Sequence, residues 1–262
     1  MPARRIRIDL AYDGTDFAGW QWQARGRTVQ ATVEAVLTRL AGDRPVRLRA
    51  ASRTDSGVHA RQQVTDGWID TRLDDRGLMR ALVALLPRDV RPTRVETVPH
   101  EFHSMRDALR KTYRFRVDLS PHGDPLIARY AVHHPHRFDR ERVAGALELL
   151  VGRRDWSGFV DSRCRVSQRV RDLSQAAWLA ERDDRGCFVF TADGFLTYMV
   201  RNIIGTLLEI ASARMPLGVI PRILETRDRR LAAATAPARG LCLWEIVYPA
   251  AGPAVERPTV RH

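Results

Sequence analysis

The sequence predicts an α+β fold of two α/β halves, whose mixed and mainly antiparallel strands form one continuous central sheet. Segments that alternate between apolar and polar residues, as half-buried strands do, recur along the chain, and helical stripes of apolar residues separate them. No short-period repeat or low-complexity linker divides the halves. We expect a first half over 1–105, a second half over 106–248 and a disordered tail over 249–262, where Pro, Gly and Ala have little to pack.

The first half is expected to follow a β-α-β-β-α-β order. Apolar residues at every second position from Ile6 to Tyr12 predict its first strand. Thr28 is a residue type that caps a helix, and Gly42 is a type that ends one. The further expected elements are a short strand over 46–50, a strand over 62–68 and a helix over 78–86, which Pro87 ends.

The second half is expected to repeat this style. Alternation from Tyr113 to Leu119 predicts a strand, and Asp139 can cap a helix. An apolar stretch predicts a further helix from Phe195 to Ala211. The remaining expected strands cover 170–179, 187–191 and 241–248, and in the last of these Leu241, Leu243 and Val247 should share one face.

The charge balance favours a polyanionic partner. Lys and Arg total 43 against 31 Asp and Glu, which gives a net charge of +12 and a pI near 10.9. Lys111 is the only lysine. A GC-rich coding bias would explain why the cations are arginines, but it does not explain why they outnumber the acids. The surplus fits nucleic acid.

Cysteine usage and hydropathy point to the cytoplasm. Cys164, Cys187 and Cys242 are widely spaced and form no Cys-x-x-Cys pair, so neither a disulfide framework nor a zinc site is indicated. No apolar run approaches the length that spans a membrane. The first residues lead into an alternating strand rather than into the apolar core of a signal peptide.

Asp55, in the segment Ser52–His59, is the main candidate for chemistry. Asp-Ser-Gly alone is an ordinary turn signature, in which the aspartate side chain caps the loop. Here Arg53 and His59 bracket the carboxylate, and a loop between strands is where a scaffold presents functional groups. Because arginine can reach phosphates or stack on bases, the segment also fits a catalytic loop that contacts RNA.

Two residues of the second half are further candidates. Arg201 starts at the edge of the buried face of its helix, where it either extends to solvent or is partly buried and needs a carboxylate partner. Tyr113 is in phase with the apolar face of its strand. It is either a core residue or a platform on which a base stacks.

The sequence offers little to hold a metal or a nucleotide cofactor. His133-His134-Pro135-His136 is the best metal candidate, but no second ligand cluster accompanies it. There is no P-loop, no Gly-x-Gly-x-x-Gly and no nucleophile elbow. We therefore expect neither a metal nor another cofactor.

Together, several segments resemble the bacterial tRNA pseudouridine synthase A family, in the family's order and over almost the whole chain. They are YDGTDFAGWQ (12–21), RTVQ (27–30), RTDSGVHA (53–60), FH (102–103), KTYRF (111–115), FLTYMVRNIIGTL (195–207) and APARGLCL (236–243). The chain departs from the family at Ser52, usually glycine, and at Ser56, usually alanine. The Arg-rich stretch Asp161–Arg169 is also less typical.

The resemblance implies the pseudouridine synthase fold and an isomerase that turns uridine into pseudouridine. It makes Asp55 the essential aspartate, Tyr113 the tyrosine that stacks on the target uracil and Arg201 the arginine that pairs with the aspartate. Arg53 matches an arginine thought to help displace the target base. The family works as a homodimer that binds tRNA across both subunits, and its targets are uridines 38 to 40 of the anticodon stem-loop.

Several points stay open at this level. Asp55 either attacks C1′ of the ribose or removes the C2′ proton. Arg27 and His59 are further candidates for contacts with the substrate. The alternative functions are a synthase of the same fold that acts on another RNA and an RNA-binding protein without catalysis. A metal-dependent nuclease would need clustered carboxylates, which the sequence does not contain.

Overall fold

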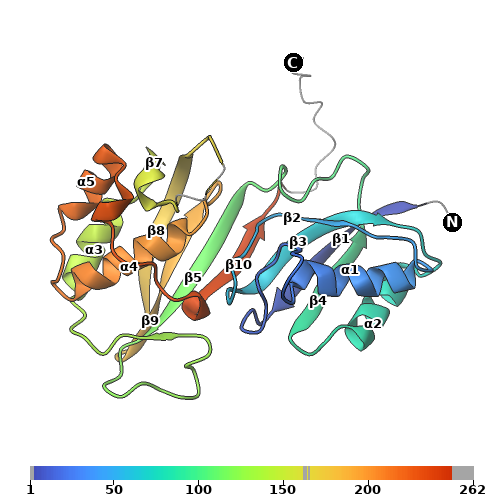
Figure 1. Ribbon diagram of the computed structural model, residues 1–262, viewed down its shortest axis with the longest axis horizontal. Coiled ribbons are helices and arrows are strands. Elements are labelled where there is room, and N and C mark those ends of the chain that lie inside the picture. The colour runs from blue at the N-terminus through green and yellow to red at the C-terminus, as the bar shows by residue number, and fades with distance from the viewer. Residues whose placement is uncertain (1–2, 162–163, 165, 250–262) are drawn as a thin grey trace, which may run out of the picture.

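The computed structural model describes residues 3–161, 164 and 166–249. Of the tail predicted to be disordered, 249–262, all but the first residue lies outside the described part of the chain. Figure 1 shows the two halves side by side along the long axis. The first half contains β1 (Arg4–Tyr12), α1 (Val29–Leu40), β2 (Leu48–Ala50), β3 (His59–Ile69), α2 (Asp75–Leu85) and β4 (Val90–Thr97). This is the expected β-α-β-β-α-β order.

The second half begins with β5 (Arg110–Asp118), whose strand had been predicted from Tyr113 onward. It continues with β6 (Val132–His133), α3 (Arg140–Glu148), β7 (Gly152–Asp155), β8 (Val170–Arg182), β9 (Arg185–Ala192), α4 (Met199–Ala211), α5 (Val219–Thr226) and β10 (Leu241–Val247). Short 3₁₀ turns cover Ser157–Phe159, Arg229–Leu231 and Ala238–Gly240.

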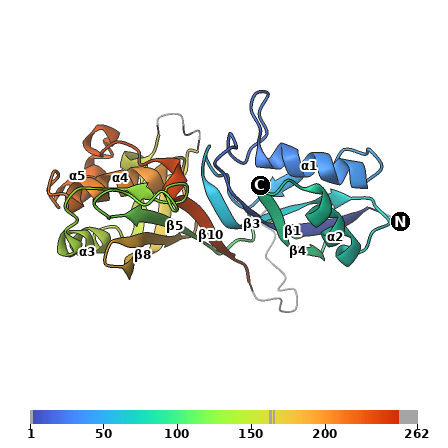
Figure 2. The same ribbon diagram turned by 90° about the horizontal axis from the view of Figure 1, so that it is seen from below.

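The ten strands found in the described part of the chain belong to one mixed sheet, which confirms the predicted fold class. The strand order is β4-β1-β3-β10-β5-β9-β8-β7, with β2 on β3 and β6 on β5. The last strand, β10, lies between the halves: it runs parallel to β3, with Cys242 opposite His59, and antiparallel to β5. Helices α1 and α2 pack on the first half, and α3, α4 and α5 gather on one side of the second (Figure 2).

Side-chain caps begin the helices where the sequence suggested them. The hydroxyl of Thr28 accepts a hydrogen bond from the Ala31 amide at 3.3 Å, and the carboxylate of Asp139 accepts one from the Arg142 amide at 3.1 Å. Both residues satisfy an amide that the first helical turn leaves without a partner. The predicted caps at Thr28 and Asp139 are therefore confirmed.

The predicted start of the apolar helix is wrong by four residues. Helix α4 begins at Met199 because Tyr198 has a φ of 60°, in the left-handed region, which a helix cannot continue through. Phe195 lies in the preceding loop and packs edge-on against Tyr113, with 5.1 Å between ring centroids. An apolar stretch in a sequence does not reveal such a residue.

The predicted face of the last strand is also wrong in part. The register of β10 against β5 shifts between Leu243 and Glu245. A shift of one residue exchanges the two faces of a strand. Ile246 is therefore buried, whereas Val247 is 41% exposed.

The structure also bears on membrane-spanning helices and on metal ligands. Among the described residues, no helix is long and apolar enough to cross a membrane. The same residues contain no group of three or more His, Cys, Asp or Glu side chains arranged to hold a metal ion. His133 instead bonds the Ser120 carbonyl at 2.8 Å, and His134 lies 3.0 Å from the Ser212 hydroxyl.

Candidate active site

A cleft of about 770 Å³ opens where the two halves meet. The first half contributes residues 51–55, in the loop that precedes β3. The second half contributes the start of β5 and residues 193–201, which lead into α4. Asp55, Arg53, Tyr113 and Arg201 all line this cleft, so four of the candidate residues come together from distant parts of the chain.

Asp55 and Arg201 form an ion pair across the cleft. Nη1 of Arg201 lies 3.2 Å from Oδ2 of Asp55, and the two side chains are 15% and 25% exposed. Nε of Arg201 donates to the Ala236 carbonyl at 2.8 Å, and the Arg201 carbonyl accepts from the Ala236 amide at 3.1 Å. Ala236 therefore fixes the arginine from behind, so that its guanidinium faces the carboxylate.

Glycines of the first half shape the loop that carries Asp55. Gly19 has a φ of 101°, and a Cβ on it would lie 2.7 Å from the Thr54 carbonyl oxygen. A Cβ on Gly14 would lie 2.0 Å from the carbonyl oxygen of Val58. Any larger residue at these positions would displace the loop. The segment 12–21 therefore packs closely against the backbone of the loop that carries Asp55.

A buried polar network holds the same loop. The Ser52 hydroxyl lies 3.0 Å from the Tyr113 hydroxyl, and Nε2 of Gln63 donates to the Ser52 carbonyl at 2.6 Å. The Tyr12 hydroxyl lies 2.8 Å from the Thr54 hydroxyl. Because buried polar groups are costly without partners, these bonds favour one conformation of the loop.

Tyr113 is held firmly in the floor of the cleft. It is 5% exposed, and its ring meets Phe195 at an interplanar angle of 87°. Burial raises the pKa of the Tyr113 phenol, and the hydrogen bond with Ser52 only partly opposes this. The side chain therefore stays neutral near neutral pH and presents a ring rather than a phenolate.

The structure separates the other three candidates. Arg53 is exposed at the cleft. Arg27 does not line the cleft. Both of its terminal nitrogens donate to the Asp89 carboxylate, Nη2 at 2.9 Å, and its guanidinium stacks over the Phe17 ring.

His59, expected to contact substrate, is 5% exposed and lies outside the cleft. Its Nδ1 accepts from the Gly14 amide at 3.0 Å, and its Nε2 lies 3.1 Å from the Arg239 carbonyl. Nδ1 also lies 3.1 Å from Oδ1 of Asp13, so both ring nitrogens already contact protein groups outside the cleft. The residues around His59 in the sequence do not reveal these contacts, because the neighbouring strand β10 comes from the far end of the chain.

Sequence reasoning also missed residues that matter for the geometry. Lys111 lines the cleft, and Gln63 bonds the carbonyl of Ser52, which lines it. Both side chains are buried. The sequence offered a signal for Lys111, since it is the only lysine of the chain. Gln63 carried no such signal, because a glutamine inside a strand is usually exposed.

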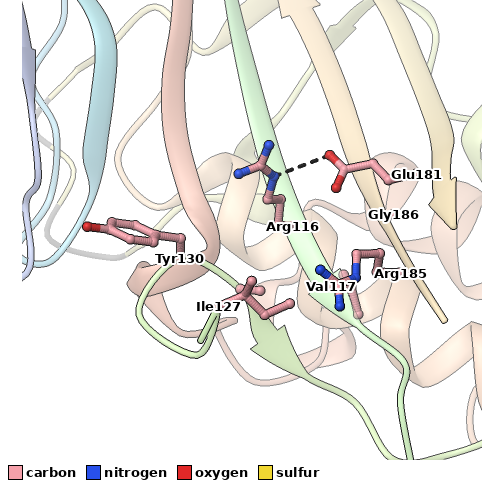
Figure 3. A pocket seen from close by; sticks show the side chains of 8 residues that line it. Arg116, Val117, Ile127, Tyr130, Glu181, Arg185 and Gly186 are labelled. Atoms are coloured by element: carbon pink, nitrogen blue, oxygen red, sulfur yellow. Dashed lines mark hydrogen bonds and ion pairs between the residues drawn. The ribbon is translucent and has the colours of Figure 1, made fainter. Parts of the chain in front are cut away.

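A second, smaller hollow of about 200 Å³ lies beside the start of β9 (Figure 3). Its cations are already paired: Nε of Arg116 lies 3.2 Å from Glu181, and Arg185 lies 3.0 Å from Asp124. Tyr130 donates to Asp13 of the first half at 2.9 Å. These contacts make the hollow a joint between surface segments, and we assign no chemistry to it.

Comparison with known proteins identifies the family of the chain. Residues 146–249 match the sequence profile of the tRNA pseudouridine synthases. The tRNA pseudouridine synthase A of Streptococcus mutans serotype c is 42% identical over 247 residues, which cover 93% of this chain and 98% of that protein. The protein of the same name from Latilactobacillus sakei subsp. sakei is 37% identical over 246 residues, with 94% and 99% covered. The chain thus belongs to the tRNA pseudouridine synthase A family, a family of isomerases.

Proposed function

We propose that the protein isomerises uridine to pseudouridine in the anticodon stem-loop of tRNA, at positions 38 to 40, with Asp55 as the reacting carboxylate. The observation that carries this proposal is the pairing of Asp55 with Arg201 in a cleft that Tyr113 also lines. The names of the relatives support the reaction and the class of substrate. The net charge of +12 supports a polyanionic substrate.

The reaction breaks the N1–C1′ bond, turns the uracil and joins it to C1′ through C5. The C5 proton leaves and N1 gains a proton, so the product is an isomer of the substrate. Asp55 acts as a carboxylate, either by attack on C1′ or by removal of the C2′ proton. The Arg201 guanidinium, 3.2 Å away, stabilises the charged form electrostatically.

A base within a stem must leave its stack before it can react. The Tyr113 ring supports a role in holding the displaced uracil, because Ser52 and Phe195 fix it at the cleft floor. Since its phenol is kept neutral, we assign Tyr113 to stacking and not to removal of the C5 proton. Arg53, exposed at the cleft, is the residue we assign to the gap that the base leaves. We include neither Arg27 nor His59 in the substrate site.

We also propose that the protein works in the cytoplasm as a homodimer that binds tRNA across both subunits. Apolar surface on the second half supports a second copy. Leu179 on β8 is 45% exposed, and it alternates with Trp178, which packs on Phe188 in the core. It therefore lies on the sheet face away from the helices. Light scattering after gel filtration should give twice the mass of 29.8 kDa, and a mass of one chain would contradict the dimer.

The test of the reaction is tritium release from unmodified tRNA whose uridines are tritiated at C5. The purified protein should release tritium, and mapping of the product should place pseudouridine at positions 38 to 40. Asp55→Asn should abolish release and retain tRNA binding. Asp70→Asn is the matched control, because Asp70 pairs with Arg44 on the surface of the same half, outside the cleft.

The outcomes separate the alternatives. Full activity of the Asp55→Asn protein would refute the role of Asp55. Pseudouridine at other sites, or in another RNA only, would retain the reaction and replace the target. Binding of tRNA without any release from the unaltered protein would favour the non-catalytic alternative.

A further inference from the structure

Lys111 has an unusual position for the only lysine of the chain. Every other member of the 43 basic residues is an arginine. Lys111 lies on β5, two residues before Tyr113, so the two side chains share a face of the sheet. It lines the cleft and is 9% exposed. The one position with a compact ammonium is therefore buried beside the reacting groups.

The ammonium contacts the backbone of the other half. Nζ of Lys111 donates to the Ala51 carbonyl oxygen at 2.6 Å. Ala51 is the first residue of the cleft loop, and its amide is tied to the Val64 carbonyl at 2.8 Å. Next to it, Ser52 meets the Tyr113 hydroxyl. Strand β5 thus contacts the start of the loop twice, with Lys111 and with Tyr113.

Arg201 contacts the same loop at its other end, through Asp55. The loop is therefore held at both ends by groups of the second half, although it belongs to the first. Among these contacts, the one from Lys111 is made to backbone, so it constrains the path of the chain rather than one side chain. A buried backbone carbonyl that loses its donor is costly, which makes this bond a strong constraint.

The groups facing Lys111 explain its protonation behaviour. On the neighbouring strands, its register partners are the uncharged Ala192 and Ile246. Burial lowers the pKa of Lys111 to about 8; the charge of Arg171 lowers it further, and that of Asp193 opposes both. The ammonium thus loses its proton in an alkaline range where arginines remain charged.

Further charged groups line the same cleft as Lys111. Arg53, Arg153 and Arg201 are cations of the same cleft, and Asp55 is the acid opposite Arg201. The nearby cations make a positive field that an RNA backbone would neutralise.

We propose that Lys111 is a positioning residue for Asp55: its ammonium holds the Ala51 carbonyl and so fixes the loop of the first half against the second. This inference rests on the proposed function. It assigns no contact with the reacting atoms to Lys111. The loop should loosen when the ammonium is removed, and the geometry between Asp55 and Arg201 should then be lost for part of the time.

The test compares Lys111→Met, which keeps the length of the side chain without a donor, with Lys111→Arg, which keeps the charge. We expect kcat of Lys111→Met to fall about 10- to 100-fold, because small displacements of a reacting group are costly. The dissociation constant for tRNA should change by less than about twofold, since the lysine is buried and contacts protein. The kcat of the unaltered protein should fall above about pH 8, because the neutral amine is a weaker donor to the Ala51 carbonyl than the ammonium, and this fall should be absent in both variants.

Arg116→Met is the matched control. Arg116 is a cation of the same strand on the opposite face, and it does not line the cleft. Its kcat and its pH profile should match those of the unaltered protein. A fall as large as that of Lys111→Met would show a general effect of charge and would overturn the positioning role.

Hydrogen exchange gives a reading that does not depend on activity. The amides of residues 51–58 should exchange at least about tenfold faster in Lys111→Met than in the unaltered protein. Unchanged exchange there, or weaker tRNA binding with an unchanged kcat, would overturn the inference. If the unaltered protein shows no activity on tRNA, the proposed function fails, and the exchange data still decide whether Lys111 holds the loop.

Discussion

Replacement of Lys111 by methionine should change how the stability of the protein depends on pH. The folded protein lowers the pKa of Lys111 from its ordinary value of 10.5 to about 8, mainly by burial. In the unfolded chain the lysine is solvated and regains its ordinary value. Between these two values the unfolded state binds more protons than the folded state, so the free energy of unfolding rises with pH.

The size of the effect follows from the shift. One pKa unit corresponds to about 1.4 kcal/mol, so the lysine should contribute on the order of 3 kcal/mol between about pH 8 and about pH 10.5. The contribution is complete above the unfolded pKa and is lost as the pH falls through the folded one. Methionine has no proton to exchange, so its variant lacks this term.

Urea denaturation of both proteins from about pH 7 to about pH 10.5 measures the difference directly. Tyrosines and cysteines titrate in the same range, but they are shared and cancel in the difference. The unaltered protein should gain stability relative to Lys111→Met as the pH rises. A constant difference across the range would show that the lysine keeps its ordinary pKa, and the reasoning from burial would be refuted.

Three further substitutions test the site and its support. Arg201→Gln should lower kcat on the order of 100-fold in the tritium assay, because the carboxylate loses its stabilising charge; an unchanged kcat would contradict the pairing. Ser52→Ala should lower the free energy of unfolding by about 1–2 kcal/mol, since the buried Tyr113 hydroxyl loses its partner. Urea denaturation would reveal this loss, and an equally stable variant would show that the bond is weak. Gly205→Ala should lower the thermal midpoint measured by calorimetry, with a cost of about 1–3 kcal/mol or more. The new Cβ would lie 1.9 Å from the Ala234 carbonyl oxygen, so an unchanged midpoint would mean that this segment moves freely.

The regular elements of the fold could be predicted because their signals are local. The period of two in β1 and β5 and the caps Thr28 and Asp139 depend on neighbouring residues only. Strand β7 and helix α5 were missed, since four and eight residues are too short for a clear period. The left-handed Tyr198 and the bulge of β10 depend on packing between distant segments, which no local pattern records.

Part of the candidate site could be predicted from the sequence, and part could not. Residue types and positions made Asp55, Tyr113 and Arg201 candidates, and the resemblance to a family gave each a role. The structure brings all three to one cleft. Neither Lys111 nor His59 could be placed in this way, because each depends on a contact with a distant segment. Lys111 reaches Ala51, 60 residues before it, and His59 reaches Arg239, 180 residues after it.

The proposed active site lies at the junction of the halves, so contacts across this junction bear on its geometry. Within the one sheet, strand β10 joins β3 of the first half to β5 of the second. A second contact lies at the surface, where Arg129 and Tyr130 both bind Asp13. Burial alone would raise the pKa of Asp13, but hydrogen bonds from Thr15, Tyr130 and Arg129 outweigh it and lower the pKa to about 2. The Asp13 carboxylate therefore stays charged near neutral pH, and its contacts with Arg129 and Tyr130 remain formed there. Since Asp55 stands on one half and Arg201 on the other, any loosening of these joints would change the distance between the two groups.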